Sequence, residues 1–324
     1  MRISSQQIFD TGLSSLQQHT SDVVEAQRQI SSGQKYSRAS DSALAAGLGV
    51  QMTFDSAQYD MFKINQEHCD RVYATADTQL KSMFDAMASF QQTLVQASNG
   101  TLSAENRQIL GAKAQKIFDT VASLAGVSKN ADGSWNQSGG KWNLRPDSIF
   151  NNTGIHLDGT AYVVESPGNS SVALNIELQN GLAKFDVLGI STQEFKSLFP
   201  SADTSSESVK SFLARHVDVL GLMQQMAQSL ETGSAPSPTD LVAIDQAIKQ
   251  VTYGQVQVGL LQNQLEAATQ WVESQKLNTE TARSNLLDTD LAQATSQLAK
   301  SNALLQAAQA IITKLDTNTL FQKL

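Results

Sequence analysis

The sequence is poor in residues that cross-link a chain or break a helix. Its single cysteine, Cys69, cannot form an intramolecular disulfide and has no metal-ligand spacing around it. All five prolines lie between Pro146 and Pro238, so residues 1–145 and 239–324 contain none. Long proline-free ends predict long helices there, with the irregular structure in the middle of the chain.

Charge and long apolar runs are also scarce. Charged residues make up only 17% of the chain, and the net charge of −8 leaves no basic footprint for nucleic acid or anionic membrane. No apolar run has the length of a membrane span, and the opening "MRISSQQIFD" lacks the apolar region of a secretory signal. If the protein leaves the cytosol, we expect export without a cleaved signal peptide.

Both ends of the chain carry apolar residues at alternating spacings of about three and four, a pattern that we call a seam and that predicts helix–helix packing. The two terminal seams comprise Phe9, Leu13, Leu16, Val23 and Ile30 near the N-terminus, and Leu291, Leu298, Leu305, Ile312 and Leu315 near the C-terminus. As helices, the two segments would each be ~45–50 Å long and could pair along their whole length.

A short break separates each terminal helix from the rest. Gly33 is expected to stop the first helix, and Ser40 or Asp41 to cap the next one. The second break lies at Asp288–Asp290, where Asp288 is expected to cap the final helix with Asp290 in its first turn.

Two further helical stretches follow the first break. The predicted seam of the first runs through Ala57, Met61, Ile64, His68, Val72, Ala76, Met83, Met87, Phe90 and Leu94. After the turn "SNGT", Ser103 is the expected N-cap of a shorter helix that ends near Ala125, with Glu105 in its first turn.

Residues 127–200 change character. The stretch "TAYVVE" predicts a strand, and the alternation of Val172, Leu174, Ile176 and Leu178 before Asn180-Gly181 predicts a hairpin. Helix returns at the capping box Thr204–Glu207 and continues past His216 to Leu230. A last long helix opens at Thr239, where Gly254 and Gly259 indicate close helix contact.

Two stretches of this sequence resemble known motifs. "QISSGQKYSRASDSALAAG" is similar to the N-terminal motif of the flagellin superfamily, and "LNTETARSNLLDTDLAQATSQLAKSNALLQAAQAIITKLDTNTLFQKL" is similar to its C-terminal counterpart. The resemblance covers residues 1–126 and 240–324. The opening "MRIS", the turn "ASNGTLSAENR" and the ending "TLFQKL" resemble the hook-associated junction proteins of that superfamily more than its flagellins.

The resemblance implies a mainly α fold with a small β-rich insertion, in which long coiled-coil-like helices from both termini pack antiparallel. It implies three regions: terminal helices and spokes at 1–40 and 285–324, a helical middle domain at 41–126 and 202–284, and a β-rich outer domain at 127–201. The breaks at Gly33–Asp41 and Asp288–Asp290 would be the two spokes that join an inner helical tube to the middle domain.

The resemblance also implies a structural role at the hook–filament junction of the bacterial flagellum. The implied partners are further copies of the chain in a ring, hook-associated protein 1, flagellin, and an export chaperone that grips the C-terminal segment. The implied location is the extracellular flagellum, reached through the flagellar type III apparatus. Neither catalysis nor a metal or other cofactor is implied.

The residues themselves favour assembly through the termini. Residues 1–32 carry only Arg2, Asp10, Asp22, Glu25 and Arg28, and residues 291–324 only Lys300, Lys314, Asp316 and Lys323. Outer faces of Ser, Gln, Thr and Ala can be buried against other copies without stranding charges. A lone helix pair of this kind would be marginal in water. We therefore interpret the terminal seams as intersubunit contacts and the middle seams as core.

Three alternatives stay open at this point. The chain could be a filament-forming flagellin, a signalling coiled coil, or an enzyme with its site in the middle region. His68 and Cys69 are adjacent and would point about 100° apart on a helix, which disfavours a catalytic dyad. The other histidines lack ligand spacing, and the Asp288–Asp290 segment lacks the glycine and distal glutamate of a calcium loop.

Overall fold

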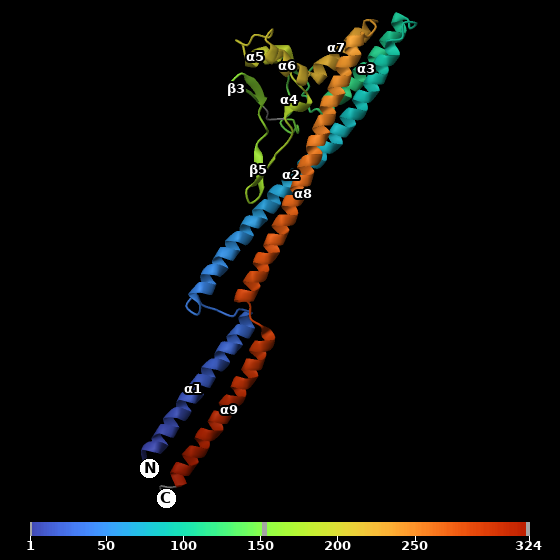
Figure 1. Cartoon of the computed structure of the whole chain (residues 1–324). Coiled ribbons are helices and arrows are strands. Elements are labelled where there is room, and N and C mark those ends of the chain that lie inside the picture. Colours follow the sequence, from blue (N-terminus) through green and yellow to red (C-terminus); the bar gives the residue numbers. More distant parts are fainter. Residues whose placement is uncertain (1, 151–153, 322–324) are drawn as a thin grey trace. The chain divides into compact units, whose positions relative to one another are not determined.

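The computed structural model describes residues 2–150 and 154–321; the side chains of residues 2–6, 8, 9 and 315–321 are not described. The chain forms two compact units, a terminal unit of Met1–Asp60 with Glu273–Leu324 and a central unit of Met61–Val272. Two long helices, α2 (Ala43–Ala97) and α8 (Pro238–Leu287), run through both units (Figure 1). The predicted fold class, mainly α with a small β-rich insertion, is confirmed.

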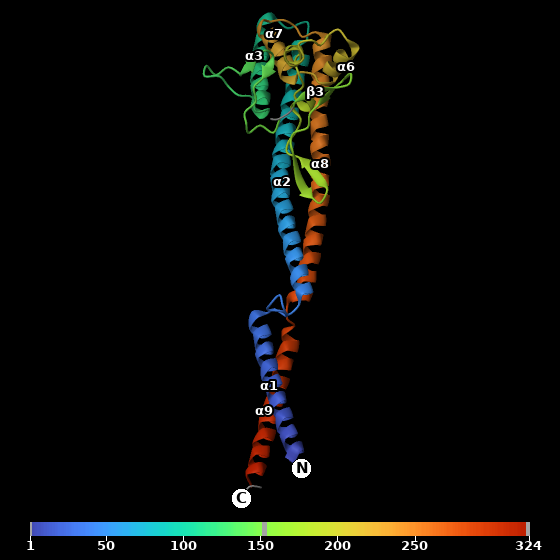
Figure 2. The same ribbon diagram turned by 90° about the vertical axis from the view of Figure 1, so that its left-hand side faces the viewer.

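The terminal unit also contains α1 (Arg2–Ser32) and α9 (Leu291–Phe321), which lie side by side in both views of the chain (Figures 1 and 2). None of these four helices has a proline beyond its first residue, so their hydrogen-bond ladders continue without a break. The start of α1 and the end of α9 lie at the same end of this pair.

The core of the central unit is an antiparallel pair of seams on α2 and α8. The α2 seam keeps strict four–three spacing and every member is buried: Phe62, Gln66, Cys69, Tyr73, Ala76, Leu80, Met83, Met87, Phe90, Leu94 and Ala97. The facing α8 seam keeps the same spacing, but one of its members, Leu261, is only half-buried; the buried members are Ile244, Ala247, Val251, Gly254, Val258, Leu265, Ala268 and Val272. A Cβ on Gly254 would lie 2.9 Å from Val187, the last residue of the short helix Lys184–Val187, so this glycine allows a close helix contact, as predicted, and Leu80 of α2 lies at the ordinary distance of 3.6 Å. Gly259 has open space instead, and that prediction is wrong.

The predicted α2 seam is wrong in its first half. Met61 and Ile64, which were predicted to be buried, are 64% and 65% exposed. Gln66 and Cys69, which were not part of the predicted seam, are buried. Gln66 is accommodated because its amide donates a hydrogen bond to the carbonyl of Val172 at 2.6 Å. The helix carries two apolar stripes at the same spacing, and only one of them faces the core.

Helices α3 (Ala104–Leu124) and α7 (Val219–Glu231) pack against each other beside this pair. The predicted N-cap is confirmed, because Ser103 Oγ accepts a hydrogen bond from the Asn106 amide at 3.3 Å. A Cβ on Gly111 would lie 2.5 Å from the backbone nitrogen of Glu231, so the two helices touch backbone to backbone. Phe118 of α3 is fully buried and lies against Trp135 and Trp142.

The helix predicted from Thr204 to Leu230 is in fact two helices. Ser206, rather than Thr204, caps α6 (Glu207–Arg215), and its hydroxyl accepts from the Val209 amide. Asp218 then caps α7 by accepting from the Gly221 amide at 2.9 Å. The apolar pattern continues from α6 into α7, but Asp218 caps a new helix within it, so the chain forms two helices there.

Three separate antiparallel pairs make up the strands of the described chain: β1 (Gln137–Ser138) with β2 (Lys141–Trp142), β3 (Ile155–Asp158) with β4 (Ala161–Val164), and β5 (Asn169–Ala173) with β6 (Ile176–Gln179). The strand predicted at "TAYVVE" is β4. The hairpin turn, however, is not at Asn180-Gly181. It is at Leu174-Asn175, where Asn175 takes a φ of 60°, a conformation that asparagine tolerates better than most residues.

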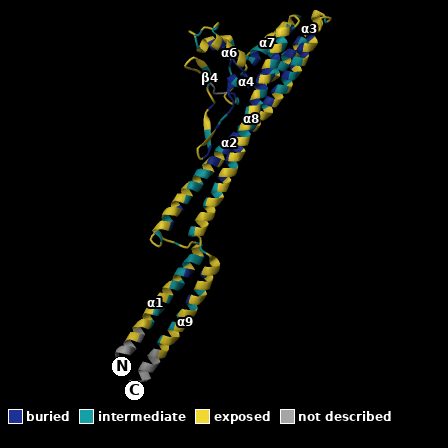
Figure 3. Cartoon of the chain, in the orientation of Figure 1, coloured by how far each residue is buried: buried dark blue, intermediate teal, exposed yellow. Residues whose placement is uncertain are grey.

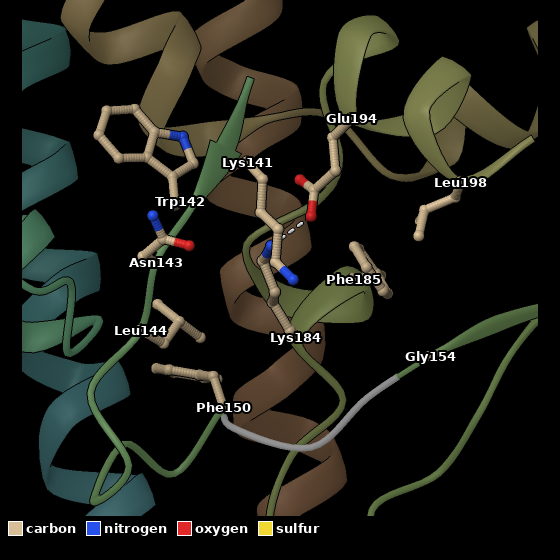
Figure 4. Close-up of a pocket in the computed structure, with 10 residues that line it drawn as sticks. All are labelled: Lys141, Trp142, Asn143, Leu144, Phe150, Gly154, Lys184, Phe185, Glu194 and Leu198. Atoms are coloured by element: carbon tan, nitrogen blue, oxygen red, sulfur yellow. Dashed lines mark hydrogen bonds and ion pairs between the residues drawn. The ribbon is translucent and has the colours of Figure 1, made fainter. Parts of the chain in front are cut away.

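The remaining helices, α4 (Lys184–Val187) and α5 (Thr192–Leu198), fold back onto the central unit. Phe185, Phe195 and Phe212 form a small aromatic core with Tyr162 of β4. A buried ion pair joins the two helices, with Lys184 Nζ 2.8 Å from Glu194 Oε1, beside a cavity of about 210 Å³ (Figure 4).

The carboxylate of Asp218, the capping residue of α7, is also buried. Burial and the nearby charge of Glu194 raise its pKa, whereas the hydrogen bonds that it accepts from the Gly221 amide and the Trp142 indole lower it.

Candidate assembly interface

The two predicted breaks lie against each other in the terminal unit. The Lys35 amide donates to the Leu287 carbonyl at 2.7 Å, and the Thr289 amide donates to the Gly33 carbonyl at 2.9 Å. Gln34 and Asp288 form an antiparallel bridge between these bonds. Gly33 ends α1 with a φ of 68°, which only glycine adopts without cost.

The caps of the two breaks differ from those predicted. Ser42, not Ser40 or Asp41, caps α2, because its hydroxyl accepts from the Ala45 amide at 3.2 Å. Asp41 lies in the loop before it, where its carboxylate accepts from the Arg38 amide at 3.0 Å. Asp290, not Asp288, caps α9 by accepting from the amides of Ala292 and Gln293. In each break the side chain closest to the helix start makes the cap.

Small residues make the close contacts between α1 and α9. Ala26, Ala294 and Ser301 are only 2–5% exposed. A Cβ on Gly12 would lie 3.5 Å from Ile312 Cγ1, which places residues near opposite ends of the chain at the same level of the pair. The two helices are therefore antiparallel and approach closely, but they bury few atoms.

The large apolar residues of the terminal seams are not buried. Half-buried are Leu16, Val23, Ile30, Leu298, Leu305 and Ile312, whereas Leu13 and Leu291 are exposed. The side chains of Phe9 and Leu315 lie outside the described residues. Among the described side chains of α1 and α9, no large apolar residue is buried. Most of both helices is coloured as intermediate or exposed in Figure 3. Whether these residues contact other subunits stays a prediction.

Sequence reasoning passed over a second set of exposed apolar residues on these helices. Val24, Leu304 and Ile311 are 59%, 41% and 56% exposed. Leu304, Ala308 and Ile311 follow four–three spacing beside the α9 seam, so α9 has an apolar face wider than one helix can cover. This wider face could have been predicted from the sequence, because apolar residues stand next to each other at Leu304-Leu305 and at Ile311-Ile312.

Two groups of charged residues in the terminal unit form ion pairs outside the contact between α1 and α9. Arg28 contacts Glu25 and lies 3.6 Å from Asp41, which ties the end of α1 to the first break. Lys276 of α8 contacts Asp60 of α2 at 2.6 Å, and this bond raises the pKa of Lys276.

Three further observations concern possible metal ligands, helix length and the cysteine in the described part of the chain. Residues 2–150 and 154–321 contain no cluster of three or more His, Cys, Asp or Glu placed to hold a metal ion. Within the same residues, every helix is too short or too polar to cross a bilayer. Cys69 is fully buried, and burial raises the pKa of its thiol. His68, next to it, is exposed.

Comparison with known families assigns both ends of the chain. Residues 3–130 match the bacterial flagellin N-terminal helical region, and residues 241–324 match the bacterial flagellin C-terminal helical region. The chain belongs to the bacterial flagellin family. The members of this family are structural proteins of the flagellum, so the chain is a flagellar component.

Individual relatives of this flagellin-family chain span nearly all of it. Flagellar hook-associated protein 3 of Salmonella typhimurium is 23% identical over 99% of both chains. Flagellin of Bacillus subtilis is 25% identical over 87% of this chain and 86% of its own length. A solved hook-associated protein of Vibrio parahaemolyticus covers 76% of this chain and all of its own, with a TM-score of 0.52 and 17% identity, which supports the fold.

Proposed function

We propose that this flagellin-family chain is the junction protein that links hook-associated protein 1 to the flagellin filament. The observation that carries the proposal is the α1–α9 pair, in which none of the large apolar side chains that the structure describes is fully covered. A helix pair that leaves Val24, Leu291 and Ile311 more than half exposed fits burial against further subunits.

The composition of the pair supports assembly rather than solvation. The outer faces of α1 and α9 consist mostly of Ser, Gln, Thr, Ala and Asn, so neighbours can cover them without desolvating many charges. Each fully covered Leu or Ile side chain would contribute about 1.5–3 kcal/mol. We infer that further copies of the chain, hook-associated protein 1 and flagellin supply this cover in a ring at the hook tip.

We prefer the junction role to a filament role because the hook-associated relative aligns with a larger fraction of this chain than the flagellin relative does. The hook-associated relative aligns over 99% of both chains, whereas the flagellin relative leaves more than a tenth of each unmatched. A filament subunit stays the alternative. The two differ in the length of the polymer, since a junction protein forms a short ring and a flagellin forms a long filament.

Export before assembly would expose the same surface to a chaperone. The free α1–α9 pair has few buried contacts, so we expect it to be largely disordered before assembly. An amphipathic α9 then suits helix-in-groove recognition by a flagellar export chaperone. We propose that the chain reaches the extracellular flagellum in this way, through the type III apparatus.

Substitution of Leu305 tests the role of α9. In cells whose own copy is deleted, Leu305→Asp should prevent incorporation at the hook tip, because the carboxylate would be buried without a partner. Flagellin should then appear in the medium. Leu305→Met is the matched control, since it keeps the apolar volume and should retain filaments.

Immunogold labelling of isolated flagella separates the two readings of the chain. Label confined to the hook–filament boundary supports a junction. Label along the whole filament supports flagellin instead. Normal filaments on cells that carry Leu305→Asp would contradict the assembly role of α9 under either reading.

A further inference from the structure

A polar cavity of about 370 Å³ lies in the central unit where the ends of α4 and α6 meet α8 (labelled in Figure 1). This volume falls within the range of small-molecule sites. The cavity uses no residue of α1 or α9, so the assembly helices do not explain it. Its floor and its rim have different chemistry.

The floor is held rigidly by Gln250 of α8, which is buried. Its side-chain oxygen accepts from the Val217 amide at 2.8 Å, and its nitrogen donates to the carbonyls of Val187 and Val217 at 3.1 Å. These bonds fasten the segments after α4 and α6 to α8. Gln250 therefore shapes the cavity instead of offering free groups to a ligand.

One wall is a fixed histidine–aspartate pair. His216 stacks on Phe212 with a centroid distance of 4.2 Å, and its Nδ1 lies 2.9 Å from the Phe212 carbonyl. Its Nε2 lies 3.3 Å from Asp186 Oδ1. Since no hydrogen bond to Asp186 Oδ2 is found within the described residues, the carboxylate keeps an oxygen that can accept from a ligand.

The rim carries groups that are not used elsewhere. Arg215 is exposed, and only its Nε is engaged, with the Ser211 carbonyl at 3.3 Å; its two terminal nitrogens have no partner among the described residues. Tyr253 is 56% exposed although its helix is well packed. Gln246 lies one helical turn from Gln250, and its side-chain amide has no hydrogen-bond partner among the described residues.

We propose that this cavity binds an acidic sugar, a hydroxyl-rich ring that bears a carboxylate. The terminal nitrogens of Arg215 match a carboxylate in a bidentate arrangement. The face of Tyr253 offers a flat surface for the sugar ring. Asp186 can accept from ring hydroxyls, and Gln246 can both donate and accept.

The opposite charges in one cavity select for this class of ligand. Lys249 also lines the cavity, but its ammonium already pairs with Asp245 at 2.6 Å. A compact anion such as phosphate would therefore gain mainly from Arg215 and would be repelled by Asp186 at the same time. A neutral sugar would bond to Asp186 and leave the guanidinium without a carboxylate. A sugar acid satisfies both groups because its charge and its hydroxyl donors lie at opposite edges of the ring.

Titration of the full-length chain tests this proposal. Sodium D-glucuronate, added up to 20 mM and followed by saturation-transfer NMR, should bind. D-glucose, followed in the same way, and inorganic phosphate, followed by the broadening of its phosphorus-31 line because it has no carbon-bound protons, should bind at least ~10-fold more weakly. Arg215→Gln should weaken glucuronate binding by ~10-fold or more, and Tyr253→Ala by a similar factor. The melting temperature of each variant shows that the fold is kept, since both side chains are exposed.

Arg71→Gln is the matched control, because Arg71 is an exposed arginine of α2 that does not line the cavity, and its glucuronate binding should equal that of the unaltered chain. Absence of glucuronate binding at 20 mM would overturn the proposal. So would phosphate binding as strong as that of glucuronate and unaffected by Tyr253→Ala, which would indicate a plain anion site.

Discussion

The α2–α8 seams of the central unit and the α1–α9 seams of the terminal unit follow the same spacing but differ in what covers them. In the central unit Tyr73, Phe90 and Met87 are fully buried, whereas the buried residues among the described side chains of α1 and α9 are the small Ala26, Ala294 and Ser301. The spacing alone shows that a helix will pack, not whether its partner comes from the same chain. The sizes of the buried residues make that distinction, since large side chains reach full burial only where more than one neighbour closes over them.

Removal of α9 should break this comparison most strongly. A chain that ends after Asp290 should lose all incorporation at the hook tip, while the central unit, whose core lies between residues 62 and 272, should melt at an unchanged temperature. Microscopy of hooks measures the first effect and thermal unfolding followed by circular dichroism the second. Retained incorporation would show that α9 is dispensable.

A core substitution in the central unit should have the largest effect on stability. Phe118→Ala removes a fully buried ring that packs on Trp135 and Trp142, and should cost about 3–5 kcal/mol. Leu298→Ala on α9, where the side chain is half-buried, should cost less than about 1 kcal/mol in the monomer. Urea unfolding of the full chain compares them, and equal costs would refute a self-sufficient core confined to the central unit.

Two glycines of α8 sharpen the comparison within one helix. A Cβ at position 254 would lie 2.9 Å from Val187, so Gly254→Ala should destabilise the central unit by about 1–3 kcal/mol. Gly259 has no atom within 4 Å of such a Cβ, so Gly259→Ala should stabilise it by about 0.5–1 kcal/mol. Opposite shifts in the urea midpoint are expected, and two shifts of the same sign would contradict the packing described.

The smallest expected effect is a loss of stability in alkali. Burial raises the pKa values of Cys69 and Tyr73 in the folded chain, so above about pH 9 the unfolded chain binds fewer protons at these groups than the folded one. Stability should fall as pH rises there. In Cys69→Ala the slope between pH 9 and 10 should be shallower, as followed by urea midpoints; an unchanged slope would show that the thiol does not contribute.

The long helices, the two breaks and the fold class could be predicted from the sequence, because the terminal arms contain no proline and few residues that end a helix. It was insufficient where polar residues occupy apolar positions. Gln66 lies in the core because Val172, far away in sequence, accepts its hydrogen bond, and no local pattern shows that contact. The Leu174-Asn175 turn was missed because apolar alternation continues across it.

The assembly residues were only partly predictable for a different reason. A search for one seam selects Leu305 and Ile312 and passes over Leu304 and Ile311, which are more exposed. A helix that must contact several neighbours needs more than one apolar stripe, and the sequence shows both stripes. What it does not show is which stripe faces the partner within the same chain.

The contact between Gly12 and Ile312 has a consequence for the order of folding. These residues are 300 positions apart in sequence, so their contact closes almost the entire chain into one loop. The entropy lost on closing so long a loop is large while the chain is unfolded, and it falls sharply once the central unit has brought α2 and α8 together. The terminal helices therefore pair last, and the surface that would join neighbouring subunits forms only on a chain that has already folded.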